Sequence, residues 1–226
     1  MNTNWVAVLL STLFCVPLAN AENGRAVTAD RVSVFEVPLV CPAAPQIGCG
    51  GASKPILLDL ERQLGVAQAW LNRAGTRIAI VWKPDSTPET RGKVAAELKE
   101  DRGTELEGRA REETVNDFLS GKSWYHAADV DRLSEEEAAI IAARLVHWVK
   151  AKTTLAKDKA EGLQRAFTDV LRRDLTGESA REKQRPPGLS DVAREYLDQE
   201  QIKILKQAIK DEEAIENGER PVPNEN

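Results

Sequence analysis

The chain has 226 residues, of which 30% are charged, and carries a formal net charge of −5. Its lysines and arginines are scattered among aspartates and glutamates, which excludes a continuous basic surface for nucleic acid or an anionic membrane. The sequence has no phosphate-binding loop, no Ser-His-Asp pattern and no cluster with the spacing of zinc ligands. We therefore expect no enzymatic activity and no catalytic residues, with thiol–disulfide exchange as the one enzymatic alternative.

The first 21 residues predict a signal peptide. Residues 6–18 are apolar but too few to span a bilayer comfortably, and residues 19–21 have the small-x-small pattern of a signal peptidase site. We expect cleavage after Ala21 and a mature chain that is periplasmic or secreted and does not insert into a membrane. A single uncleaved anchor helix is the alternative.

Residues 22–110 predict a first domain of short strands and helices in the order β-α-β-β-α-β. Helices are expected to begin near Ser53 and Pro88, and Pro38 is a residue that an internal strand does not tolerate. The middle two strands are apolar on both faces, so we expect the C-terminal helices or a partner to cover Trp70 or Trp82. Period-two apolar patterns indicate the strands at 34–41, 66–71, 76–82 and, weakly, 104–109.

The rest of the chain has no strand signal. We expect a linker over residues 111–128, an all-helical region over residues 129–216 and a disordered tail over residues 217–226. Residues 184–188 break the helical pattern. The helical region is a candidate surface for a protein partner or for self-association.

Two segments of the helical region, Leu133-Ser-x-x-Glu137 and Leu197-Asp-x-x-Gln201, have the pattern of capping boxes at helix N-termini. They also resemble the Leu-Thr-x-x-Gln boxes of periplasmic stress proteins, a group that includes metal-stress chaperones. The acidic runs at residues 135–137 and 211–213 are interpreted as solvated helix faces.

Cys41 and Cys49 are the only cysteines after the signal peptide, and they lie between the first strand and the first helix. Two thiolates suffice to coordinate Cu(I) or another soft ion, and a helix N-terminus lowers the pKa of a thiol. An exported pair can equally form a structural disulfide, which would stabilise the fold by roughly 2.5 kcal/mol. A thioredoxin-like exchange pair is a third reading.

Residues 22–110 resemble the heavy-metal-associated domains of copper chaperones and periplasmic mercury-binding proteins. The resemblance lies in the position of these thiols, the element order, the segment Leu64-Gly-Val66 and residues 76–83. The resemblance implies a ferredoxin-like βαββαβ domain that binds Cu(I), Hg(II) or a similar ion through Cys41 and Cys49. In that family two residues separate the cysteines, whereas seven separate them here. With the helical region, the expected fold class is α+β.

His126, Asp129 and Asp131 form a secondary candidate site for a harder divalent ion, with an aromatic anchor at residues 124–125 as the simpler reading. His147 lies at helical spacing among apolar residues and is expected to be a packed or edge residue of its helix. The sequence thus predicts a periplasmic soft-metal binding or carrier protein. The alternative is a non-enzymatic envelope stress or interaction protein in which the cysteines form a structural disulfide.

Overall fold

The computed structural model describes residues 27–100, 103–178 and 187–223. The expected signal peptide lies outside these ranges, as do residues 224–226 of the expected tail and most of the break at 184–188. Within them the fold is mixed α/β, with one five-stranded antiparallel sheet and seven α-helices. No helix in the described ranges is both long and apolar enough to cross a membrane.

The sheet has the strand order β4-β1-β3-β2-β5, and every neighbouring pair is antiparallel. The first strand is shorter than expected and ends at Glu36, before Pro38, because proline has no N–H to donate to a neighbouring strand. β1 can therefore be an internal strand, between β3 and β4. The five strands are β1 (Val32–Glu36), β2 (Val66–Asn72), β3 (Arg77–Trp82), β4 (Thr104–Glu105) and β5 (Trp124–His126).

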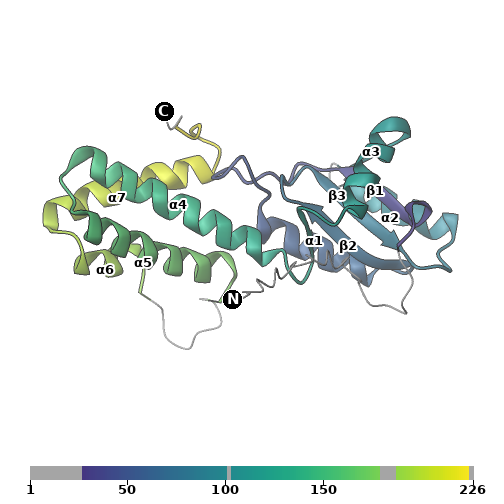
Figure 1. Cartoon of the computed structure of the whole chain (residues 1–226), viewed down its shortest axis with the longest axis horizontal. Helices are drawn as coiled ribbons and strands as arrows, with labels where there is room; N and C mark the ends of the chain where they lie inside the picture. Colours follow the sequence, from purple (N-terminus) through teal and green to yellow (C-terminus); the bar gives the residue numbers. More distant parts are fainter. Residues whose placement is uncertain (1–26, 101–102, 179–186, 224–226) are drawn as a thin grey trace, which may run out of the picture.

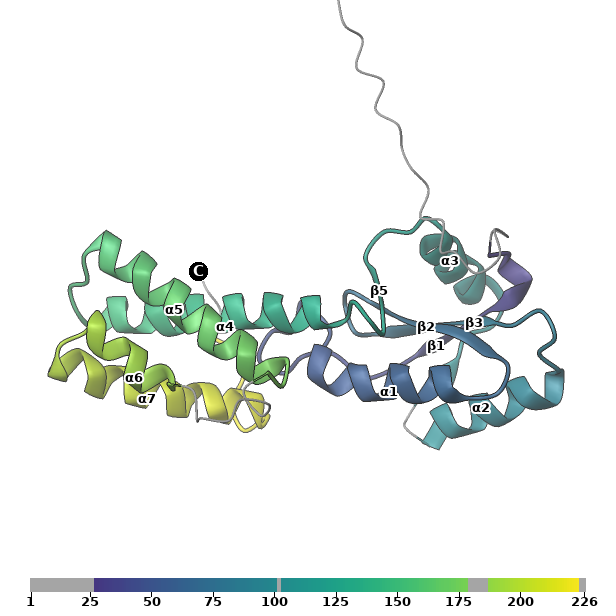
Figure 2. The same ribbon diagram turned by 90° about the horizontal axis from the view of Figure 1, so that it is seen from below.

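Both faces of the sheet are covered, as Figure 2 shows. α1 (Gly50–Arg62) and α2 (Pro88–Glu100) lie on one face, and α3 (Gly108–Leu119) lies on the other. The face under α3 forms a small core of its own, with the buried residues Val32, Val34, Ala79, Val81, Val115, Phe118 and Trp124.

The segment 111–128, expected to be a linker, holds most of α3 and all of β5. The Trp70 ring packs against Phe118 of α3, with the ring centroids 5.8 Å apart. Trp82 is buried in the core on the other face, under the guanidinium of Arg91 from α2. Thus α3 covers the Trp70 indole and α2 covers the Trp82 indole, whereas the C-terminal helices were expected to cover one of them.

Beyond residue 130 the described residues form helices and turns, without a strand. The Asp198–Gln201 capping box is present, with the Asp198 carboxylate accepting from the Gln201 backbone N–H at 2.9 Å. The Ser134–Glu137 segment is not a cap, because its helix already begins at Asp131. The elements are α4 (Asp131–Lys152), α5 (Lys157–Leu175), α6 (Leu189–Val192), a 3-10 turn (Ala193–Glu195) and α7 (Gln199–Glu216).

The molecule is elongated, with the sheet half at one end and the helical half at the other (Figure 1). α4 runs from the sheet half along α5 and α7, and its first turns pack beside the start of α1. The largest buried apolar cluster is continuous across this junction: it contains Leu57 of α1, Ile141 of α4 and Leu205 of α7. The two expected domains therefore share a core.

Candidate thiol site

The segment between β1 and α1 folds as a small hairpin that carries both cysteines. The Cys41 N–H donates to the Ile47 carbonyl at 2.9 Å, and the Cys49 N–H donates to the Leu39 carbonyl at 2.8 Å. Val40 and Gly48 form a bridge between these two bonds. Because the hairpin doubles back at residues 42–46, the seven intervening residues return Cys49 to the side of Cys41. We call residues 37–49 the thiol loop.

The thiol loop is anchored to the turn between β2 and β3. The Leu39 N–H donates to the Gly75 carbonyl at 2.9 Å, and the Gly48 N–H donates to the Arg73 carbonyl at 2.7 Å. A Cβ at Gly48 would lie 2.8 Å from the Gly75 Cα, so the two backbones can approach this closely only as glycines. Gly75 also has a positive φ of 71°. The loop is thus fixed by backbone contacts on the sheet side.

The two thiols have different environments. Cys41 is buried, with 1% of its surface exposed, while Cys49 is half-buried and occupies the N-cap position of α1. The helix starts three residues before the expected Ser53, whose hydroxyl instead donates to the Cys49 carbonyl at 2.6 Å. Both cysteines are free thiols here. Cys49 therefore sits at the positive end of the α1 dipole.

The two thiols interact, and the interaction shifts their pKa values in opposite directions. The hydrogen bond from the Cys41 thiol is the largest cause that lowers the pKa of Cys49, to about 6, and the backbone N–H groups of Ala52 and Gly51 contribute further. The same bond, together with burial, raises the pKa of Cys41. At neutral pH the pair therefore holds a Cys49 thiolate that accepts a hydrogen bond from a Cys41 thiol.

Glu137 of α4 is the nearest acidic group to Cys41. It is 5% exposed, burial raises its pKa, and it forms a hydrogen bond with the Cys41 thiol. Its Oε2 atom and the hydroxyl of Ser134, one turn earlier, have no hydrogen-bond partner among the described residues. Repulsion from the charges of Cys49 and Glu212 adds to the effect of burial, whereas the hydrogen bond from Cys41 lowers the pKa.

Arg144 and Glu212 form a buried ion pair behind the loop, with 3% and 4% of their surfaces exposed. The Arg144 Nε donates to Glu212 Oε2 at 2.8 Å, and its Nη2 donates to the other carboxylate oxygen. The same Nη2 donates to the Ala43 carbonyl at 2.7 Å. The pair thus connects α4, α7 and the tip of the thiol loop.

The secondary candidates are not gathered around one point. His126 contacts Glu61, with Nε2 2.7 Å from Oε1, and its ring packs against Trp70. Asp131 pairs with Lys54 of α1, while Asp129 is exposed. His147 is also exposed. The described residues contain no group of three or more His, Cys, Asp or Glu side chains placed to hold a metal ion.

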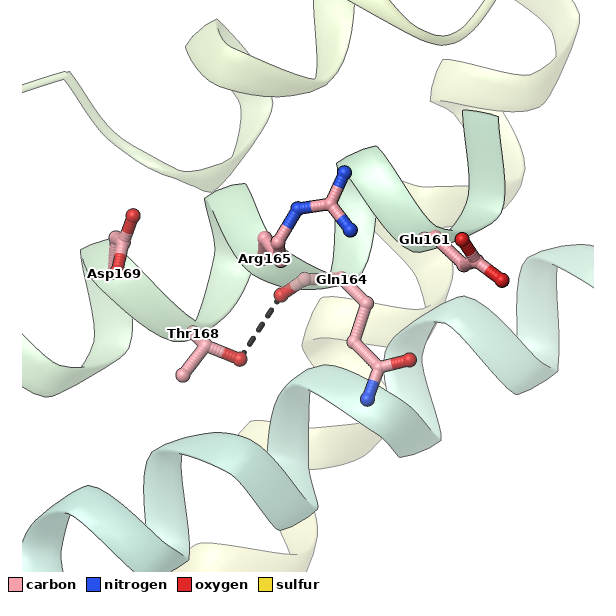
Figure 3. A pocket seen from close by; sticks show the side chains of 5 residues that line it. All are labelled: Glu161, Gln164, Arg165, Thr168 and Asp169. Carbon is pink, nitrogen blue, oxygen red and sulfur yellow. Dashed lines mark hydrogen bonds between the residues drawn. The ribbon is translucent and has the colours of Figure 1, made fainter. Parts of the chain in front are cut away.

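Two hollows on the surface of the described residues add no second chemical centre. One lies along α5 and is lined by five residues of that single helix, among which Thr168 donates to the Gln164 carbonyl at 2.9 Å (Figure 3). Another lies beside the thiol loop, where Pro42, Pro45 and Gln46 face Ile140 and the C-terminal residues. The first is an exposed helix surface, and the second borders the thiol site itself.

Comparison of the chain with known protein families, curated proteins and solved structures finds no match.

Sequence reasoning found both thiols but missed Glu137, Arg144 and Glu212. The two glutamates belong to the acidic runs that were interpreted as solvated. A signal was present: Glu137 lies four residues after Leu133 and four before Ile141, on the apolar face of α4. Glu212 likewise lies seven residues after Leu205 on α7. An acid in register with an apolar stripe marks a buried carboxyl.

Proposed function

We propose that Cys41 and Cys49 bind a soft metal ion, of the Cu(I) or Hg(II) class, in a ferredoxin-like domain of an exported protein. The observation that carries the proposal is the contact between the two thiols at the N-terminus of α1. Two thiolates are a sufficient ligand set for such ions, and one of the two is already ionised at neutral pH.

The element order β1-α1-β2-β3-α2-β4 and the place of the thiols between β1 and α1 support the likeness to heavy-metal-associated domains. The wide spacing of the cysteines does not separate them, because the loop folds back on itself. Half-exposed Cys49 would be the ligand through which an ion arrives and leaves, while buried Cys41 retains it. Transfer to a partner's thiols would then proceed one ligand at a time.

A second function is favoured by the asymmetry of the pair. A half-exposed thiolate beside a buried thiol is also the arrangement that suits reversible dithiol–disulfide exchange, in which Cys49 attacks and Cys41 resolves. Exchange requires that the bridge form and break readily. A structural disulfide, in contrast, would remain closed in a mild reducing buffer.

The test uses the mature chain, reduced and then titrated with Cu(I) or Hg(II) against a chromophoric chelator. We expect one ion per chain, and we expect Cys49→Ser and Cys41→Ser to lose this stoichiometric binding while staying folded. Gln46→Ala is the matched control: it changes the loop tip but leaves both thiols, so it should bind as the wild type does. Failure of the reduced wild type to compete with the chelator, or undiminished binding by Cys49→Ser, would refute the proposal.

A thiol count on the freshly isolated protein separates the alternatives. Two free thiols, or two thiols released with a metal ion, agree with metal binding. A bridge that opens and closes in glutathione buffers, in a chain that binds no soft ion when reduced, indicates the exchange function. A bridge that resists those buffers indicates a structural disulfide.

A further inference from the structure

The thiol loop is held from two sides, and the second side belongs to the helical half. On the sheet side the loop bonds to the β2–β3 turn. On the other side its tip meets a guanidinium that is itself held by α7. Ala43, Ala44 and Ile47 of the tip are all buried, with at most 1% of each exposed. The tip is therefore packed between the two halves of the molecule and is not a free surface loop.

We propose that Arg144 and Glu212 are positioning residues of the thiol site: by clamping the Ala43 carbonyl they fix the tip of the loop and thereby the spacing of Cys41 and Cys49. This inference rests on the proposed function only for its metal-binding measurement. The assignment makes Glu212 of α7, more than 160 residues after Cys49 in the chain, a structural part of the site. The site would then be a product of both halves.

The chemistry of the pair fits this role better than a purely stabilising one. A buried ion pair adds little net stability over apolar side chains of the same volume, because both charges lose their hydration. The planar guanidinium of arginine holds both oxygens of a carboxylate and still donates to a carbonyl in fixed directions, whereas the three donors of lysine lie on one freely rotating nitrogen. Each of these three bonds is made by Arg144. The arrangement thus provides directional contacts to the loop.

The test is the double variant Arg144→Met/Glu212→Met, which replaces the pair by apolar side chains and removes the bond to Ala43. The matched control is Arg172→Met/Glu178→Met, which removes an ion pair of the helical half that does not touch the loop. Folding is checked by thermal unfolding and circular dichroism. Two readouts follow in the full mature chain: Cu(I) affinity by chelator competition, and the dithiol–disulfide equilibrium in glutathione buffers.

We expect the double variant to fold and to bind Cu(I) about 10- to 100-fold more weakly, the usual effect of losing a group that orients a metal ligand. Its equilibrium with glutathione should shift by about tenfold or more, because closing the bridge depends on the same spacing of the thiols. The control should match the wild type in both measurements. Wild-type values in the folded double variant would overturn the inference.

Two further outcomes also have a defined interpretation. If the wild type binds no Cu(I), the proposed function fails, and the glutathione equilibrium alone decides the present inference. If the double variant does not fold, Arg144→Lys replaces it, since lysine keeps the charge but lacks the planar fork of donors that reaches both Glu212 and Ala43. An affinity or a glutathione equilibrium between those of the wild type and of an unconstrained dithiol supports the inference, and unchanged values refute it.

Discussion

At the scale of single residues, the two thiols of the site differ in the groups that surround them. Cys41 and Cys49 are one hydrogen bond apart, yet one is enclosed beside a carboxyl and the other lies at a helix N-terminus. The chemical identity of the two side chains is the same, so the difference in their acidity comes from the positions that the fold gives them. Three residue-level consequences can be measured.

The first prediction concerns the reactivity of Cys49. Its alkylation by iodoacetamide should rise with pH around a midpoint near 6, because only the thiolate reacts. Cys41 should stay unmodified in the folded chain. In Cys41→Ala the midpoint should move up toward that of an ordinary thiol, whereas Cys41→Ser, which keeps an O–H donor, should move it less. A midpoint that is the same in all three proteins would contradict the hydrogen bond as the cause.

The same pKa predicts how stability varies with pH. The folded pKa of Cys49 lies below its unfolded value, so the unfolded chain binds more protons between the two values and stability rises with pH there. The contribution is fully present above the ordinary thiol pKa and is lost as pH falls through about 6. Urea unfolding of the reduced wild type and of Cys49→Ala should therefore diverge from pH 6 toward pH 9. Parallel curves would exclude a lowered pKa.

For Glu137 we predict that stability varies with pH in the opposite direction. Burial raises its folded pKa, so its contribution is complete below the ordinary value of 4.5 and is lost as pH rises through the folded pKa. The stability of the wild type relative to Glu137→Gln should decline from pH 4 to pH 8 in urea titrations. Glu135→Gln, on the exposed side of the same helix, should show no such trend. A difference that does not vary with pH would mean that the buried carboxyl does not titrate in this range.

At the scale of elements, the junction of α1 and α4 sets where the thiols lie. The first turn of α1 packs against α4 so closely that Gly50 has no room for a side chain: a Cβ there would overlap the Ser134 hydroxyl and lie 2.9 Å from the Val130 carbonyl. The Lys54–Asp131 ion pair joins the same two helices. A residue that separates α1 from α4 would thus move Cys49 away from Glu137.

We therefore predict that Gly50→Ala destabilises the protein by about 1–3 kcal/mol, as expected for overpacking against backbone. The adjacent Gly51→Ala is the control, because its nearest neighbour would be the Leu175 carbonyl at an ordinary 3.7 Å. Alanine favours a helix over glycine, so Gly51→Ala should be neutral or up to about 1 kcal/mol more stable. Both values follow from urea midpoints, and equal effects of the two substitutions would contradict the close packing.

Elements with strong patterns were predictable, and those with weak patterns were not. The alternation at β2 and β3 indicated both strands within a few residues, and the helical character of residues 129–216 was visible in the sequence. α3 was missed because most of its residues are polar, and only Val115 and Phe118 are buried. β5 was missed because three residues carry no period. Its strand character comes from pairing with β2, which the local sequence does not encode.

The candidate site likewise has a part that the sequence predicts and a part that it does not. The thiols were recognisable because cysteines are rare in this chain and their place before a helix is visible in the sequence. The carboxyls of Glu137 and Glu212 are buried by tertiary packing. Because both residues belong to acidic runs, their segments are typical of exposed helix faces. The return of Cys49 to Cys41 depends on contacts between the thiol loop and the β2–β3 turn, and spacing alone does not reveal them.

At the scale of the whole molecule, the shared core predicts cooperative unfolding. A single buried cluster joins the sheet half to the helical half, so neither half can lose its packing without exposing the other. In a mature chain carrying Trp148→Phe, the remaining indoles report on the sheet half, while far-ultraviolet circular dichroism reports mainly on the helices. The two signals should give the same urea midpoint. Two separate transitions would instead support independent domains.

Residues 221–223 are a suitable place to attach a fluorescent reporter of the thiol site. Pro221, Val222 and Pro223 line the same hollow as Pro42 and Pro45 of the thiol loop, and Figure 1 shows α7 ending near the middle of the molecule. A fluorophore attached at residue 223 would stand beside the loop without touching either cysteine. The occupancy of the thiols could then be followed optically in the intact protein.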